Sequence, residues 1–369
     1  MLGYRNIAND FSGIASGCHG FSQNGYLYVH AGSPSALERK QFDNNAAGAG
    51  IVSRTPSGYA SDETNLWTFD DIFDEGSSGT VLVAHAAPNL VNIDQNTDMP
   101  VYYGDVIGTA QLTAIPDLEV SGGIVALPPY LFAYGSYGEV KWSVPGEITN
   151  FTGEGSGSDR ITGSKIVKGL RYRGGPANSP AGLFWSLDSL IRVSFVGGAN
   201  TFRADTISDE ISILAQNSVV PYDGKYFWIG ADRFMMFDGT VREVPNTFNL
   251  DFFFGNLNYA QRQKIWGIKV PRFGEIWWFF PKGESLECNH VIILNVREET
   301  WYDTALDRSC GFYRQVFPFP VMFGTELDGS DKVILWQHEY GYDRISGDSV
   351  VAIPSYFETP DISYCATGP

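Results

Sequence analysis

A short apolar triplet recurs about every fifty residues along the chain, usually just after a glycine. The central residues of successive triplets lie 55, 49, 53, 43, 50 and 57 positions apart. An apolar run that follows a turn residue is typical of a buried strand. The pattern therefore predicts seven strand-rich units of similar size. The triplets are Tyr26-Leu27-Tyr28, Val81-Leu82-Val83, Tyr130-Leu131-Phe132, Leu183-Phe184-Trp185, Tyr226-Phe227-Trp228, Ile276-Trp277-Trp278 and Val333-Ile334-Leu335.

The sixth triplet belongs to a run of four consecutive aromatic residues in "RFGEIWWFFP", residues 272–281. Successive side chains of a strand point to opposite faces of its sheet. Four consecutive rings therefore need apolar cover on both faces. We expect this strand to be buried from both sides and to pair with "HVIILNV", residues 290–296.

Seven units of this length predict an all-β fold, a β-propeller of six to seven blades packed around a central channel. A content of 41 Gly, 19 Pro and 14% aromatic residues suits short strands and tight turns. Few short helices are expected, the best near 256–264. We assign 1–369 to one propeller domain; a pair of β-sandwiches is the alternative. The predicted blade-core residues are Leu27, Leu82, Leu131, Phe184, Trp185, Phe227, Trp228, Trp277, Trp278 and Ile334.

Two local predictions concern the connections between strands. Asp238-Gly239 predicts a tight hairpin between two strand-like runs, with positive φ at both turn positions. Propellers avoid a free edge by joining their first and last strands in one blade. The run from Ser16 to Gly32 is the predicted closing partner.

The charge of the chain is acidic and unevenly distributed. The net charge is -17, and residues 55–140 contain no Lys or Arg. Tight binding to nucleic acid needs a clustered basic surface, and none is visible, although contact with a genome is not excluded.

No segment reaches the ~18 apolar residues of a membrane helix, and the first residues lack the apolar core of a secretion signal. The four sparse cysteines suit reduced thiols in a cytosol.

The sequence contains no recognisable catalytic or metal-binding motif. A Gly-x-Ser-x-Gly elbow, the Ser-x-Asp-x-Gly-x-x-Trp box of sialidase-like propellers and a His pair at i, i+4 are absent. Asp94, Asn96 and Asp98 alternate like calcium ligands, but Met99 replaces the turn glycine, which favours a polar turn over a calcium loop. Cys288-x-His290 has no second ligand pair. We expect no enzyme activity, no metal and no cofactor, although paired carboxylates leave hydrolysis open.

An acidic cluster, "FDDIFDEGSSG", occupies residues 69–79. One interpretation is a solvated loop that keeps the protein soluble. The other is an acidic wall that repels DNA phosphates during rapid passage. Candidate lumen or interface residues are Asp70, Asp71, Asp74 and Glu75.

Four stretches resemble the blades of tail hub or nozzle proteins of short-tailed bacteriophages, which include the packaged-DNA stabilisation protein family. They are "GGIVALPPYLFAYGSYGEVKWSVPG", "GLFWSLDSLIRVSFVGG", "VVPYDGKYFWIGADRFMMFDGTVREVP" and "FGEIWWFFPKG" continued by "NHVIILNVREETWY". "LWTFDDIF" and "WQHEYGYD" extend the resemblance over residues 18–345. These motifs are blade-packing patterns, so they indicate the architecture better than the exact role.

The resemblance implies a structural virion protein, a tail subunit that forms a ring with other copies of itself, expected as a homohexamer. Such a ring extends the DNA channel, retains the packaged genome and anchors an adaptor protein and fibres, spikes or a needle. Phage DNA passes without sequence-specific binding. The expected location is the virion tail, after synthesis in the host cytoplasm and without membrane insertion. Family relatives continue further, so we expect residues after "SYFETPDISYCATGP", residues 355–369.

Two other functions remain open at this point. The first is a carbohydrate-binding or glycan-hydrolysing propeller that recognises a host surface. It needs Trp67, Trp142 or Trp301 exposed in a pocket beside paired carboxylates. The second is a plug protein inside the tail channel, which shares the fold and differs in copy number.

Overall fold

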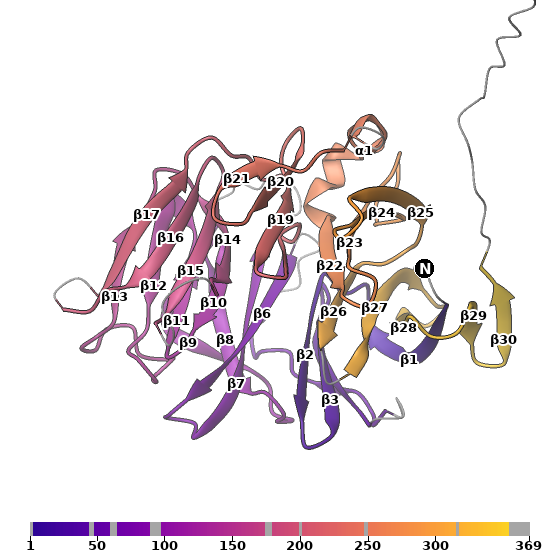
Figure 1. The fold of residues 1–369 in the computed structure, drawn as a ribbon. Coiled ribbons are helices and arrows are strands. Elements are labelled where there is room, and N and C mark those ends of the chain that lie inside the picture. The colour runs from indigo at the N-terminus through magenta and orange to yellow at the C-terminus, as the bar shows by residue number, and fades with distance from the viewer. Residues whose placement is uncertain are drawn as a thin grey trace, which may run out of the picture.

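The chain forms a seven-bladed β-propeller, as the spacing of the apolar triplets predicts (Figure 1). The computed structural model describes residues 3–43, 48–59, 65–88, 97–173, 179–198, 201–246, 250–314 and 317–353. Residues 355–369, after which the resemblance implies a continuation, lie outside this description. Of the predicted six to seven blades, the structure has seven.

Blades 1 to 6 are antiparallel sheets whose four strands follow one another in sequence order. Blade 1 contains β2 (Gly17–Gln23), β3 (Tyr26–Gly32), β4 (Leu37–Phe42) and β5 (Val52–Ser53). Blade 2 contains β6 (Asn65–Asp74), β7 (Gly79–Pro88), β8 (Met99–Asp105) and β9 (Thr113–Val120). Blade 3 contains β10 (Gly123–Leu127), β11 (Tyr130–Tyr134), β12 (Glu139–Trp142) and β13 (Gly157–Arg160).

The next three blades repeat this arrangement. Blade 4 contains β14 (Ile166–Arg171), β15 (Ala181–Ser186), β16 (Leu190–Phe195) and β17 (Phe202–Ser208). Blade 5 contains β18 (Val220–Tyr222), β19 (Lys225–Ile229), β20 (Phe234–Phe237) and β21 (Val241–Glu243). Blade 6 contains β22 (Trp266–Val270), β23 (Glu275–Phe280), β24 (His290–Asn295) and β25 (Thr300–Ala305).

Blade 7 closes the ring by combining strands from both ends of the described chain. Its order is β26 (Cys310–Arg314), β27 (Phe317–Leu327), β28 (Lys332–His338) and then β1 (Tyr4–Ser12). β1 runs antiparallel to β28, from the pair Tyr4 and His338 to the pair Ser12 and Lys332. The N-terminal strand therefore covers an edge of blade 7 that would otherwise be free.

The prediction that Ser16–Gly32 closes the ring is wrong, because that run forms β2 and β3, the first two strands of blade 1. The closing strand β1 has two register shifts along its pairing with β28, and only Ala8 and Phe11 within it are buried. The sequence of β1, "YRNIANDFS", does not alternate apolar and polar residues, and this alternation is the pattern by which strands are recognised. The strand was therefore not predicted.

Besides the blade strands, the described residues form two further strands and three short helices. β29 (Asp343–Ser346) and β30 (Ser349–Ala352) form a hairpin that joins the outer side of β1 through a parallel pairing of β29. α1 (Leu250–Asn256) and the 3-10 helix η2 (Tyr259–Lys264) connect blades 5 and 6, and η1 (Ser136–Gly138) is a single turn in blade 3. The helix expected near 256–264 corresponds to η2, whereas α1 was not anticipated.

The hairpin predicted at Asp238-Gly239 is present, but its turn differs from the predicted one. Phe237 pairs with Val241, so the loop between β20 and β21 has three residues. Only Gly239 in this loop has a positive φ, of 116°. The glycine is needed there because a side chain at such a φ would be strained.

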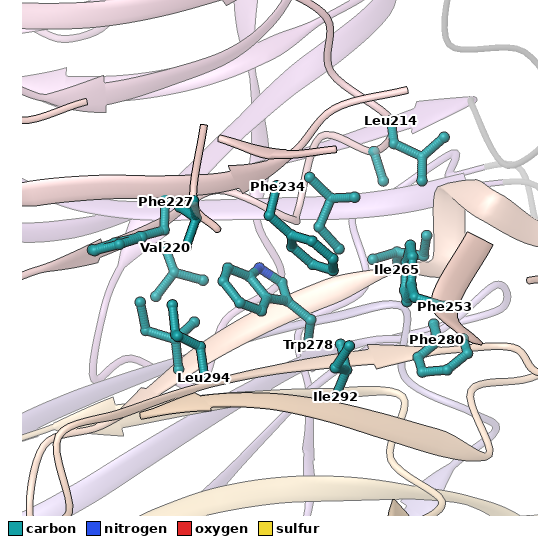
Figure 2. Close-up of a cluster of buried hydrophobic side chains, with 14 of the residues drawn as sticks. Leu214, Val220, Phe227, Phe234, Phe253, Ile265, Trp278, Phe280, Ile292 and Leu294 are labelled. Carbon is teal, nitrogen blue, oxygen red and sulfur yellow. The ribbon is translucent and has the colours of Figure 1, made fainter. Parts of the chain in front are cut away.

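Each interface between neighbouring blades has its own hydrophobic core, which gives seven buried clusters for seven interfaces. The aromatic strand β23 shows how they form, because all six of its residues are buried. Trp278 and Phe280 pack toward blade 5 (Figure 2), whereas Trp277 and Phe279 pack toward blade 7. The expectation that β23 is covered on both faces is confirmed, and so is its pairing with β24.

Nine of the ten predicted blade-core side chains are buried, and Ile334 is half-buried. In blades 1 to 6 the triplets lie on the second strand of the blade. In blade 7 the triplet around Ile334 lies on the third strand, β28. The equivalent second strand is β27, where Val321, Met322 and Phe323 are fully buried. Two adjacent apolar triplets occur in this blade, and only the later one follows an Asp-Gly turn signal.

Tryptophan side chains also form hydrogen bonds between neighbouring blades. Trp67 of blade 2 donates its ring N–H to the carbonyl oxygen of Ser33 in blade 1, at 2.9 Å. Trp278 of blade 6 donates to the carbonyl oxygen of Ser218, just before blade 5, at 2.8 Å. Each of these hydrogen bonds satisfies a buried indole N–H and contributes about 1 kcal/mol to stability. These contacts link the blades through the residues that also fill the interface cores.

Replacing Phe11 tests the closing strand. Phe11 is 1% exposed in the core between blades 7 and 1, and its ring meets that of Phe323 edge-on at 4.9 Å. Phe11→Ala should lower the free energy of unfolding by about 3–5 kcal/mol, because it leaves a cavity at the closure. Urea unfolding measures this change. Phe73→Ala is the matched control, because Phe73 is 58% exposed. Equal effects of the two substitutions would contradict the closure described here.

Candidate functional site

The first strands of the seven blades lie innermost and surround the channel. They are β2, β6, β10, β14, β18, β22 and β26. A cavity of about 900 Å³ lies at the end of the channel where most of these strands begin. Segments of all seven blades line it. Its wall includes Cys18, Asp70, Tyr134, Lys168, Asn217 and Trp266.

Lys168 on β14 supplies a cation to the cavity wall. Its Nζ atom donates a hydrogen bond to Oδ1 of Asn217 at 3.3 Å. Burial lowers the pKa of Lys168 to about 8, although the negative charge of Asp70 opposes the shift. A lysine with this pKa is mostly protonated at neutral pH and loses its proton as the pH rises through about 8.

Asp70 on β6 supplies a carboxylate to the same wall and also ties two blades together. Its Oδ2 accepts a hydrogen bond from the backbone N–H of Ala126 in blade 3 at 2.8 Å, and its Oδ1 accepts from the N–H of Asp71 at 2.9 Å. Burial raises the pKa of Asp70 above its ordinary value, and these hydrogen bonds oppose the shift. The cavity thus offers a carboxylate, an ammonium group and an amide to a small polar solute.

Asp71 joins the inner strands of three consecutive blades. Its Oδ1 lies 2.7 Å from an Nη2 donor of Arg314 in blade 7 and 2.9 Å from Nε2 of His19 in blade 1. Arg314 also donates to the carbonyl oxygen of Gly20 in β2. Burial alone would raise the pKa of Asp71, but hydrogen bonds and charge from His19 and Arg314 lower it to about 2. This ion-pair network spans the closure between blades 7, 1 and 2.

The other two acidic candidates, Asp74 and Glu75, hold the turn at the end of β6. Asp74 is 3% exposed; its Oδ2 accepts from the N–H of Ser77 at 2.7 Å and its Oδ1 from that of Ile148 in blade 3 at 3.1 Å. Glu75 is exposed, and its backbone N–H donates to the carbonyl oxygen of Gly146 at 2.8 Å. Asp74 therefore has a structural role in this turn.

Cations also lie on the inner strands of the propeller, so carboxylates alone do not line its channel. Lys168, Lys269 and Arg314 belong to the inner strands of blades 4, 6 and 7. Burial, followed by the charges of Arg173 and Arg314, lowers the pKa of Lys269. These residues were not predicted from the sequence. The position of Lys168 and Lys269 on the strand before a recurring triplet could have indicated them, since that strand is the innermost one in blades 4 and 6.

The two weak metal-ligand patterns of the sequence, around Asp94 and at Cys288-x-His290, gain no support from the described residues. Asp94 and Asn96 lie outside the described residues, and Asp98 is exposed. Cys288 donates its thiol to the carbonyl oxygen of Lys264 at 3.2 Å, and His290 pairs with Asp303 at 2.8 Å. Within the described ranges, no three His, Cys, Asp or Glu side chains are grouped closely enough to hold a metal ion.

The three tryptophans that a sugar-binding site would use pack against other residues. Trp67 and Trp142 are 2% and 8% exposed. Trp301 is half-buried, stacks on Trp278 at 6.0 Å and donates its ring N–H to the carbonyl oxygen of Pro245 at 2.9 Å. All three rings therefore serve the interfaces between blades. In the part of the chain that the structure describes, no helix is long and apolar enough to span a membrane.

Comparison with known proteins identifies the fold and no more. No protein-family model matches the chain, and no curated protein matches it significantly. The chain is similar to the extracellular domain of a putative one-component system from B. thetaiotaomicron, with a TM-score of 0.55 at 10% sequence identity. That alignment covers 91% of this chain and 42% of the other. A computationally designed protein is also matched, with a TM-score of 0.44 at 11% identity over 91% of this chain and 100% of that one.

Replacing Asp71 tests the ion-pair network at the closure. A carboxylate whose pKa is lowered to about 2 by folding stabilises the protein above its unfolded pKa of ~4. That contribution is lost as the pH falls through about 2. Asp71→Asn should therefore lower the free energy of unfolding by about 1–2 kcal/mol at neutral pH, after allowance for solvent screening. The difference from the wild type should shrink between about pH 4 and pH 2.

Urea unfolding at a series of pH values measures this difference. Asp98→Asn is the control, because Asp98 is exposed. A difference for Asp71→Asn that stays constant down to about pH 2 would contradict the network.

Proposed function

We propose that this chain is a structural subunit of a bacteriophage tail, a nozzle or hub protein that forms a ring with other copies of itself. The ring, with six copies, extends the DNA channel, retains the packaged genome and anchors an adaptor protein on one side. Fibres, spikes or a needle attach on the other side. In this role the propeller is a rigid building block, and its contacts with neighbours carry the function.

The resemblance to tail proteins supports the proposal, because the segments that carry it are the strands of the blades. "GGIVALPPYLFAYGSYGEVKWSVPG" contains β10 to β12, and "VVPYDGKYFWIGADRFMMFDGTVREVP" contains β18 to β21. "FGEIWWFFPKG" contains β23, whose residues are buried between blades 5 and 7. The shared features are thus those that build a propeller, and the specific role must come from its surface.

The β29–β30 hairpin is the observation that carries the proposal. Blade 7 already has four strands when β1 is in place, so the hairpin adds a fifth and a sixth strand to a closed ring. All four residues of β30 are exposed, including Val350 at 62% and Val351 at 53%. Tyr342, just before β29, is 81% exposed. Figure 1 shows the hairpin projecting from the side of the propeller.

Such a hairpin is suited to contact another subunit. Exposed apolar side chains and, within the described part of the chain, an unpaired outer edge of β30 are features that soluble proteins normally avoid or cover. A ring requires two different contact surfaces on each subunit, and a projecting hairpin meets that requirement on one side. The net charge of -17 also suits a protein past which DNA must move without adhering.

Labelling of phage particles tests the proposal directly. An antibody against this chain, visualised with gold by electron microscopy, should mark the distal end of the tail in purified particles. Label found only on the capsid, or absence of the chain from particles, would end the proposal. Robust hydrolysis or binding on a glycan array, together with that absence, would favour the carbohydrate-recognising alternative.

The hairpin can be tested with a matched pair of variants. Val350→Ser combined with Val351→Ser should reduce the amount of chain recovered in purified particles at least about tenfold, equivalent to a loss of about 1.4 kcal/mol of contact energy. The free energy of unfolding should change by less than about 0.5 kcal/mol, because both side chains are exposed. Val196→Ser is the control, since Val196 is 50% exposed in blade 4. Equal recovery of both variants would rule out the hairpin as a subunit contact.

A further inference from the structure

Two cysteines meet where the propeller closes. Cys18 lies on β2, the inner strand of blade 1, and Cys310 begins β26, the inner strand of blade 7. These two inner strands are direct neighbours. Both side chains belong to the hydrophobic cluster between blades 7 and 1, and the ring of Phe312, two positions after Cys310, packs against Gly20, two positions after Cys18. The two cysteines therefore occupy matching positions on neighbouring strands, the arrangement that a disulfide between these strands needs.

The pair can be reached by a small reagent through the channel. Both cysteines line the cavity of about 900 Å³ at the start of the inner strands. Cys18 is half-buried, whereas Cys310 is 6% exposed. A third thiol, Cys288, lines the same cavity but belongs to the core between blades 6 and 7, on the other face of blade 7. Cys18 is therefore the first thiol of the pair that an oxidant meets.

We propose that Cys18 and Cys310 form a reversible disulfide that locks blade 1 to blade 7 across the closure of the propeller. The reaction partner is a low-molecular-weight disulfide such as oxidised glutathione. The bond would connect two positions 292 residues apart and so hold together nearly the whole ring. This inference does not depend on the tail assignment, because it uses only the closure of the fold.

The reaction proceeds by two thiol–disulfide exchanges. Cys18 loses its proton to solvent, and its thiolate attacks one sulfur of the oxidant. A Cys18–oxidant disulfide forms, the oxidant's own S–S bond breaks, and the released half takes up a proton as a thiol. Cys310 then loses its proton and attacks the Cys18 sulfur, which releases the second half as a thiol. Two protein thiols are oxidised by two electrons, and one small disulfide is reduced to two thiols.

The environment of the pair predicts a slow reaction that accelerates with pH. Burial raises the pKa of the Cys18 thiol well above its ordinary value, and the neighbouring Cys310 thiol raises it further. Only the thiolate is nucleophilic, so little of the reactive form exists at neutral pH. Such a pair stays reduced in a cytosol and closes slowly in an oxidising medium.

The test uses the full chain with Cys365→Ser in every sample, so that three thiols remain. Reduced protein is incubated with oxidised glutathione at about pH 8.5. Free thiols are counted with a chromogenic disulfide, and peptides are mapped by mass spectrometry without reduction. The expected result is one free thiol, a Cys18–Cys310 peptide pair and a rise in Tm of about 5 °C that a reductant reverses. The rate should increase with pH.

Matched variants assign the bond. Cys288→Ser should leave the peptide pair and the Tm shift unchanged, whereas Cys18→Ala and Cys310→Ala should abolish both. Circular dichroism of the reduced variants checks that each is folded. Three free thiols after incubation, glutathione retained on Cys18, or a bond between Cys288 and Cys310 would each overturn the proposal.

Discussion

The antiparallel pairing of β1 with β28 is the interaction on which the rest of the structure depends. It joins the N-terminal strand to the last blade, and without it blade 7 would end in an open edge. Phe11 on β1 also fills the core between blades 7 and 1. The Asp71 network and the Cys18–Cys310 pair lie at the same closure, on the inner side of the ring. Apolar packing, charge and thiol chemistry thus meet where the two ends of the ring are joined.

Packing between blades explains why the chain needs so many aromatic residues. Each blade has two buried faces, so a strand such as β23 places alternate rings in two different cores. Rings of this size bury on the order of 150–250 Å² each, which is more than aliphatic side chains provide. Trp67 and Trp278 additionally satisfy a polar group across the interface. Trp67 and Trp278 therefore supply both apolar area and hydrogen bonds between neighbouring blades.

The regular part of the fold could be predicted from the sequence, and the irregular part could not. Equal blades repeat the same burial requirement, so the triplet spacing indicates seven units and the doubly buried strand β23. The closing strand β1 has only two buried residues and gives no periodic pattern. In blade 7 the second strand, β27, was missed because the Asp-Gly turn signal precedes the apolar triplet on β28 and not the one on β27. The channel network was also missed, because Asp71 and Arg314 are 243 residues apart and only the closed ring brings them together.

Hydrogen exchange of β1 tests the closure most directly. If β1 closes the ring, amides of the peptide Tyr4–Ser12 that pair with β28 exchange as slowly as those of Lys332–His338, and both open in one cooperative step. Phe11→Ala should accelerate the exchange of both peptides together. Rapid exchange of Tyr4–Ser12 while Lys332–His338 stays protected would contradict the account, because the ring would then be held without its N-terminal strand.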